Sequence, residues 1–289
     1  MKKILFFTIF LLINLQPIIA FENKDWNNIV KEYSTEEKLL NFVYKLPAES
    51  QLLIVRKSCE HMMKTQPQNR WNEISLGVSL LLYTYPKTAQ YYQKLIDEIQ
   101  NEKYIDLYRL KLLQFISSKE RISNIDINHF EKLMDYLSKK VEIRSEHNEF
   151  NEQKNYIIIT TSLVKKFKTY AKFQSDEPKV NNIIGKTIDK LVLLGLSDKI
   201  DTSSRYEIYV RLDSLNRLNI NVNQYALHTI LQKTFNSESD KDTKYRLAKW
   251  LLEKFNDKET IEKEVRQNAD QIVKNNLNLI MKEFSEKNK

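Results

Sequence analysis

The hydrophobic residues between positions 70 and 117 recur at helical spacing in three successive sets. The first set ends before Pro86 and consists of Trp71, Ile74, Val78, Leu81, Leu82 and Tyr85. The second set consists of Ala89, Tyr92, Leu95, Ile96 and Ile99, and a third runs from Tyr104 to Ile116. This spacing predicts three helices in a row. Because each apolar face needs a neighbour, we expect helical hairpins that pack on one another.

The same periodicity continues on both sides of this region and predicts helices along nearly the whole chain. Further apolar stripes cover residues 26–33, 39–46, 52–63, 130–141, 156–170, 180–192, 206–218, 222–235 and 245–255, with a last, charged helix over 261–279. Asp126 or Asn128 is expected to cap the helix that follows, and Ser175-Asp176-Glu177-Pro178 is a typical helix start. Gly195 is placed to act as a C-terminal glycine.

Glycine is scarce, with three residues in 289. Phosphate-binding loops, dinucleotide folds and nucleophile elbows need several glycines at fixed spacing, and strand-rich folds use glycine in their turns. The predicted fold class is therefore all-α.

Two hairpins share one plan when the chain is compared with itself at an offset of about 39 residues, which aligns Pro47 with Pro86. The second hairpin resembles a tetratricopeptide repeat, since Leu76-Gly77, Leu80 and Ala89 match the small-residue positions of that family. Gln93, Ile96 and Asn101 depart from its pattern, and a HEAT-type array fits the spacing equally well. The resemblance implies stacked helical hairpins of the α-solenoid type; an irregular helical bundle is the alternative.

The first 20 residues have the features of a secretory signal peptide. Lys2 and Lys3 precede an apolar run from Ile4 to Leu15, and cleavage is expected after Ala20. An uncleaved anchor is the alternative, although the run is shorter than the roughly 20 residues that span a bilayer. The single cysteine, Cys59, does not follow this run, so we expect neither a lipoprotein nor an intramolecular disulfide. The prediction is an exported, periplasmic or secreted domain over residues 21–289, with subdivision near 118–127 or 174–178.

The formal charge of +8 falls to +6 when the two signal-peptide lysines are removed. In an exported protein a positive charge favours an acidic protein, an anionic membrane surface or an acidic polysaccharide over nucleic acid. The same charge also serves ordinary solubility.

Several polar groups could supply metal-binding or catalytic chemistry, and each also has a structural explanation. Cys59-Glu60-His61-Met62-Met63 contains soft metal ligands, but Cys59 and the two methionines continue an apolar stripe. Asp126 and His129 form half of a dinuclear carboxylate pattern whose second half is missing. The carboxylates around His147 alternate with Lys140 and Arg144, as on a solvated helix face. We therefore expect no catalytic, cofactor or metal site.

Two surfaces are candidates for partner binding. One is the tyrosine-rich hairpin with Tyr83, Tyr85, Tyr91 and Tyr92, where the rings could equally pack between helices. The other is the segment 154–172, which lacks acidic residues and carries Lys165, Lys168 and Lys172 on one face. The predicted function is an exported, non-enzymatic helical scaffold for a protein or peptide partner in the cell envelope. The alternative is binding of anionic lipid or acidic polysaccharide through the lysine-rich helix.

Overall fold

The computed structural model describes residues 46–65, 89–117, 125–142, 152–169 and 177–288. These residues contain eleven helices and no strand, which confirms the all-α prediction. The signal segment, the helices predicted over residues 26–33 and 71–85, and all but Leu46 of the helix predicted over 39–46 lie outside the described residues, so only the second helix of each hairpin compared at an offset of 39 is described. The chain divides into two units, residues 1–129 and 130–289, which are described separately.

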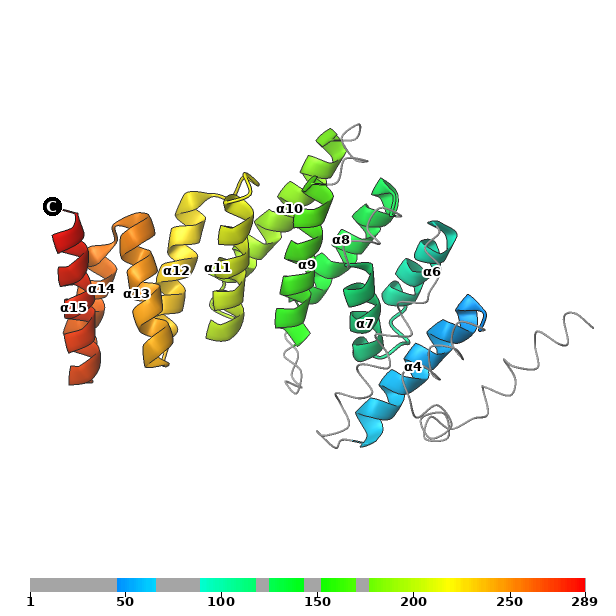
Figure 1. Cartoon of the computed structure of the whole chain (residues 1–289), viewed down its shortest axis with the longest axis horizontal. Helices are drawn as coiled ribbons and strands as arrows, with labels where there is room; N and C mark the ends of the chain where they lie inside the picture. The colour runs from blue at the N-terminus through cyan, green and yellow to red at the C-terminus, as the bar shows by residue number, and fades with distance from the viewer. Residues whose placement is uncertain (1–45, 66–88, 118–124, 143–151, 170–176, 289) are drawn as a thin grey trace, which may run out of the picture. The chain divides into compact units, whose positions relative to one another are not determined.

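The first unit contains α4 (Ala48–Thr65), α6 (Ala89–Gln100) and α7 (Asp106–Ile116). Helix α7 packs against both α4 and α6, as Figure 1 shows. Val55, Tyr92 and Leu112 from these three helices are fully buried in the core. The described part of this unit thus agrees with the predicted hairpin of residues 89–116.

The second unit begins at Phe130, within α8. Its helices are α8 (Ile127–Glu142), α9 (Glu152–Thr169), α10 (Glu177–Leu196), α11 (Thr202–Asn216), α12 (Gln224–Ser237), α13 (Lys241–Phe255), α14 (Lys258–Gln267) and α15 (Gln271–Lys287).

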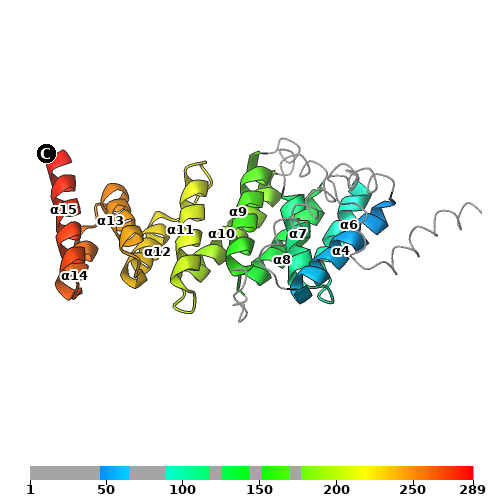
Figure 2. The ribbon, with the colours of Figure 1, turned by 60° about the horizontal axis from the view of Figure 1, so that its bottom comes forward.

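Helices of the second unit pack mainly on those one or two positions away in the chain. Close contacts join α9 to α11 and α13 to α15, and the side chains of α11 and α13 meet around Trp250. The even-numbered helices form a second set. In it, ion pairs join α8 to α10, and α10 packs on α12. His228 of α12 lies 2.7 Å from Asp257, the residue that caps α14. Alternate helices therefore form two layers, which can be followed in Figures 1 and 2. The stacked helical hairpins predicted from the sequence are present in this unit, with helices that range from 10 to 20 residues.

The last five helices all start with an aspartate or asparagine cap. Their side chains accept hydrogen bonds from free amides of the first turn, and the capping residues are Asp201, Asn223, Asp240, Asp257 and Asp270. Asp126 caps α8 in the same way, by accepting from the His129 amide at 2.9 Å. Such a cap contributes about 1 kcal/mol to the stability of each helix.

The prediction for Gly195 was wrong. Helix α10 continues to Leu196, and no described glycine has a positive φ. A Cβ atom at Gly195 would lie 2.9 Å from Ile230 Cδ1 and 3.1 Å from Ile208 Cγ2. The residue is therefore a point of close approach between α10, α11 and α12 rather than a cap. The left-handed position at the end of α13 is taken by Asn256, with φ of 51°.

The single last helix predicted over residues 261–279 is two helices, α14 and α15. Asn268 Oδ1 accepts from the Asp270 amide at 2.8 Å, and Asp270 Oδ1 accepts from the Ile272 amide at 2.8 Å. These side-chain bonds replace the bonds of a continuous helix, although the apolar spacing runs on across the break.

Candidate functional site

The groups considered as metal ligands have structural roles wherever they are described. Cys59 is fully buried, and burial raises the pKa of its thiol to about 12. Asp126 caps α8 and lies 2.8 Å from His129 Nδ1, while Glu142 pairs with Lys190 at 3.7 Å. Within the described residues, no group of three or more His, Cys, Asp or Glu side chains is placed to hold a metal. The side chain of His61, and Glu146, His147 and Glu149, lie outside them.

The tyrosines of the first unit pack between helices. Tyr92 is fully buried, which removes its ring from any contact surface, and Tyr91 is half-buried; Tyr83 and Tyr85 lie outside the described residues. The Tyr108 hydroxyl donates to Glu98 Oε2 at 2.7 Å, and the Tyr104 ring lies 4.8 Å from the Arg56 guanidinium. The first pair therefore connects α7 to α6, and the second connects the segment just before α7 to α4.

The lysine-rich segment has an acidic neighbour that the sequence pattern did not reveal. Lys165 is exposed, but Lys168 pairs with Glu177 of α10 at 3.3 Å and donates to Asn181 at 2.8 Å. Lys154 lies 3.8 Å from Glu207 of α11, and Lys172 is outside the described residues. Two of the lysines on α9 are thus partly neutralised by neighbouring helices.

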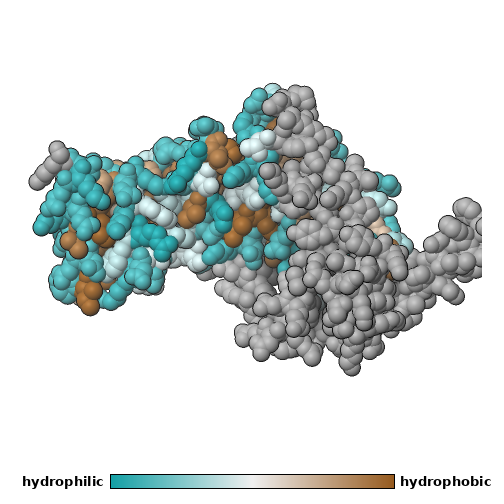
Figure 3. Space-filling view, in the orientation of Figure 1, coloured by the Kyte–Doolittle hydropathy of each residue, from teal (hydrophilic) through white to brown (hydrophobic). Residues whose placement is uncertain are grey.

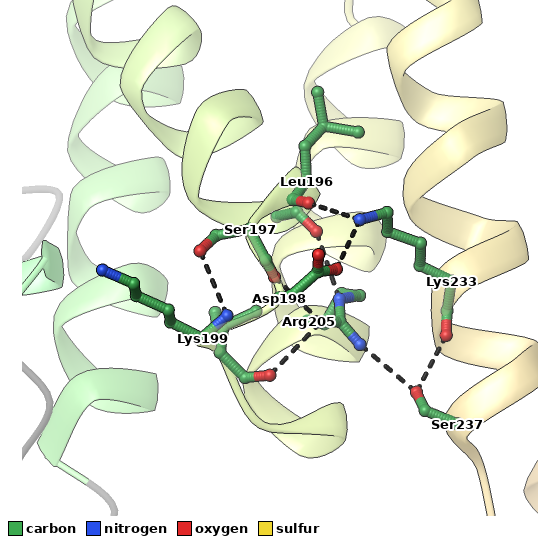
Figure 4. Close-up of polar contacts among 9 residues, drawn as sticks. Leu196, Ser197, Asp198, Lys199, Arg205, Lys233 and Ser237 are labelled. Atoms are coloured by element: carbon green, nitrogen blue, oxygen red, sulfur yellow. Dashed lines mark hydrogen bonds and ion pairs between the residues drawn. The ribbon is translucent and has the colours of Figure 1, made fainter.

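A buried arginine, Arg205 of α11, holds the C-terminal end of α10 (Figure 4). Its Nε donates to the Gly195 carbonyl at 3.2 Å, and its Nη2 donates to the carbonyls of Ser197 and Ile200 at 2.9 and 3.3 Å. Its Nη1 donates to Ser237 Oγ of α12 at 3.2 Å. Burial lowers the pKa of Arg205, and Asp198 and Asp201 oppose that effect.

Lys233 of α12 adds a second positive charge at the same helix end. Its Nζ donates to the Leu196 carbonyl at 2.8 Å and to Asp198 Oδ1 at 2.6 Å, which lowers the pKa of Asp198. Cations are favourable at a helix C-terminus, where carbonyl groups lack partners. Because the donors of Arg205 are directed at main-chain carbonyls and Ser237, this junction joins three helices and is not organised around a ligand.

A second polar cluster joins α12 to α14. Asp257 Oδ2 lies 2.7 Å from His228 Nε2 and accepts from Gln232 Nε2 and Thr260 Oγ1, both at 2.8 Å. Burial raises the pKa of Asp257, but the hydrogen bonds from Thr260, His228 and Gln232 outweigh burial and leave the pKa below its usual value. The His228 ring also stacks on Phe255, with 4.6 Å between ring centroids. This pair superficially matches a His–Asp catalytic dyad, yet its contacts are those of a helix cap and an interhelical tie.

The remaining candidate is on the layer that contains α11 and α13, and we call it the aromatic–arginine face: Tyr206, Arg246 and Trp250. The Tyr206 and Trp250 rings are half-buried and stacked, with 6.1 Å between centroids and an interplanar angle of 15°. Arg246 is exposed, and its Nη1 lies 3.5 Å from the Tyr206 hydroxyl. No described carboxylate forms an ion pair with Arg246, although its charge contributes to the lowered pKa of Asp240.

The aromatic–arginine face rests on a buried support. The buried Tyr209 ring contacts Trp250, with 5.7 Å between ring centroids, and Lys254 Nζ, which pairs with Asp213 at 2.6 Å, lies near both rings. On the side shown in Figure 3, the described surface is largely hydrophilic with separate hydrophobic spots. The sequence pattern did not single out these residues, because Tyr206 and Trp250 come from separate helices.

Comparison with protein-family models, with curated proteins and with solved structures finds no match for this chain. Among the described helices, none combines the length and the apolar composition that a bilayer-spanning helix requires.

Proposed function

We propose that this chain is an exported, non-enzymatic α-helical scaffold that binds a protein or peptide partner in the cell envelope. The observation that carries the proposal is the aromatic–arginine face, in which two half-buried rings lie beside an exposed guanidinium. Aromatic residues and arginine are enriched in protein interfaces and dominate their binding energy. Rings that are already stacked lose little conformational freedom when a partner covers them.

The distribution of charge supports an acidic partner. Helix α9 carries four lysines and one glutamate, and α13 carries five basic and two acidic residues. In the other layer, α8 and α14 each carry three basic and three acidic residues. Helices α9 and α13, in the layer that contains the aromatic–arginine face, therefore carry a positive excess that α8 and α14 lack, and this excess favours encounter with an acidic surface.

The alternative function, binding of anionic lipid or acidic polysaccharide, would use Lys165, Lys168 and Lys172. The pairing of Lys168 with Glu177 weakens this reading, since that lysine already has a carboxylate partner. Replacement of all three lysines by glutamine tests the alternative directly. If liposomes with anionic headgroups bind the wild-type chain at low salt but do not bind the triple variant, the lysine-rich helix is the binding surface.

Site-specific photocrosslinking in the producing cell tests the main proposal. A photoreactive residue replaces Ser203 or Lys249, which are exposed on α11 and α13, or Lys186, which is exposed on α10 in the other layer. We expect a discrete polypeptide adduct from Ser203 and Lys249 and not from Lys186. The adduct is identified by mass spectrometry, and the purified partner should bind the purified chain. Absence of any light-dependent adduct from these positions contradicts the proposal.

Export is tested separately. The mature protein recovered from the envelope or medium should have an N-terminus near Phe21, measured by mass spectrometry. A chain with an intact Met1 in the cytoplasmic fraction would be incompatible with an exported scaffold.

A further inference from the structure

We infer that the aromatic–arginine face takes an acidic peptide segment, with a carboxylate on Arg246 and an adjacent apolar side chain on Trp250. This inference rests on the proposed function and specifies its ligand class and its site. It starts from the state of Arg246. A guanidinium has five N–H donors in a planar fork that matches a carboxylate, whereas Arg246 has only the Tyr206 hydroxyl at 3.5 Å.

Other arginines in the second unit form ion pairs or hydrogen bonds within the chain. Arg211 pairs with Glu207 at 2.7 Å, Arg217 pairs with Asp213 at 2.7 Å, and Arg205 donates to backbone carbonyls. Arg217 is exposed as well, but it has a carboxylate partner, whereas no described carboxylate forms an ion pair with the exposed Arg246. A ligand carboxylate at this position would form a charge-assisted hydrogen bond without displacing an existing ion pair.

The neighbouring rings add the apolar half of the site. The Tyr206 ring stacks with Trp250 and the buried Tyr209 ring lies 5.7 Å from it, so packing within the chain holds the half-buried Trp250 ring before a ligand arrives. A peptide that places a carboxylate on Arg246 would bring the next side chains over this ring. Apolar contact with this ring would add to the charge-assisted hydrogen bond at Arg246, so both parts of the peptide contribute to affinity.

The charges that flank Arg246 favour a peptide over a continuous polyanion. Asp242 and Glu253 are exposed on the same stripe of α13 as Arg246 and Lys249, at intervals of three or four residues, and form no ion pair with a described residue. A uniformly anionic polymer or membrane would meet both carboxylates and be repelled. A peptide with a single local carboxylate avoids them.

The inference is tested with random dodecapeptides displayed on phage and selected on the full chain. We expect enriched peptides to contain Asp or Glu next to an apolar residue. The dominant peptide is then synthesised with a fluorophore, and its affinity is measured by fluorescence polarisation for the wild type, Arg246→Glu and Lys186→Glu. Lys186 is an exposed lysine of α10, and its substitution changes the net charge by the same amount.

Arg246→Glu should weaken binding by about tenfold or more, since a hydrogen bond between charged groups is lost and repulsion replaces it. Lys186→Glu should leave affinity within about twofold, and a peptide whose acidic residue is changed to lysine should bind Arg246→Glu better than wild type. Circular dichroism should show both variants folded.

The two levels of the proposal fail in different ways. Enriched peptides that lack acidic residues, or that bind Arg246→Glu and Lys186→Glu equally, overturn this site while leaving a peptide-binding scaffold standing. If no peptide is enriched and the photocrosslinking experiment also gives no adduct, both the site and the proposed function are wrong. Anionic vesicles can also be added as competitors of the peptide. If they displace it equally well from wild type and from Arg246→Glu, the site is overturned.

Discussion

Two glycines in α10 allow helix propensity and packing to be measured separately. A Cβ atom at Gly185 would meet nothing within 4 Å, so Gly185→Ala should stabilise the protein by about 0.5–1 kcal/mol. A Cβ atom at Gly195 would lie 2.9 Å from Ile230 Cδ1 and 3.1 Å from Ile208 Cγ2, and both isoleucines are fully buried. Overpacking of this kind costs about 1–3 kcal/mol. Gly195→Ala should therefore be about 1–3 kcal/mol less stable than Gly185→Ala.

Urea unfolding followed by circular dichroism at 222 nm measures both variants under identical conditions. A third substitution provides the rescue, because Ile230→Val removes the Cδ1 atom nearest the new methyl group. Alone it should cost about 0.5–1.5 kcal/mol, but in the Gly195→Ala background it should cost less or restore stability. Equal stability of Gly185→Ala and Gly195→Ala would refute the close approach of α10, α11 and α12.

Two further predictions concern the polar ties. Arg205→Met leaves the buried carbonyls of Gly195 and Ile200 without their donors, and each unpaired carbonyl costs about 1–3 kcal/mol. Urea unfolding should therefore show a free energy of unfolding lower by about 2–5 kcal/mol, and Arg205→Lys should recover part of this loss. A loss below about 1 kcal/mol would contradict the structural role of this junction. The folded-state pKa of Asp257 is lowered, so its stabilisation is present above the usual value of 3.8 and is lost as the pH falls through the lower folded value. The stability difference between wild type and Asp257→Asn should therefore be largest near neutral pH and shrink below about pH 4 in thermal unfolding scans, whereas a difference that does not change with pH would argue against this role of the Asp257 carboxylate.

The sequence predicted much of the fold because its signals are local. Apolar spacing located the described helices, and Ser175-Asp176-Glu177-Pro178 indicated the start of α10, which begins at Glu177. The errors came where local chemistry competes with periodicity. Apolar spacing continues through Asn268 and Asp270, so only their side-chain bonds to backbone amides reveal the break between α14 and α15. Likewise, whether Gly195 serves as a cap or as a contact depends on Ile208 and Ile230, which belong to later helices.

The candidate site was beyond sequence reasoning for a related reason. Tyr206 and Trp250 lie on different helices, and neither belongs to a motif that would pair them. The two surfaces that composition did suggest are altered by neighbours: Tyr92 is enclosed by the first unit, and Lys168 meets Glu177 of the next helix. A cluster of tyrosines or lysines in the sequence thus does not show whether each side chain is exposed or paired, because both depend on how the helices pack.

The layered arrangement of the second unit also bears on how it folds. Its closely packed helices are one or two positions apart in the chain, and even the contact of Lys154 with Glu207 closes a loop of only about fifty residues. Low contact order of this kind favours rapid folding by successive local steps. It also means that α14 and α15, at the end of the array, can open without breaking the contacts among α9, α10 and α11. Hydrogen exchange at the C-terminal pair is then governed by a local equilibrium, while the amides of α10 and α11 report on the unfolding of the array around them.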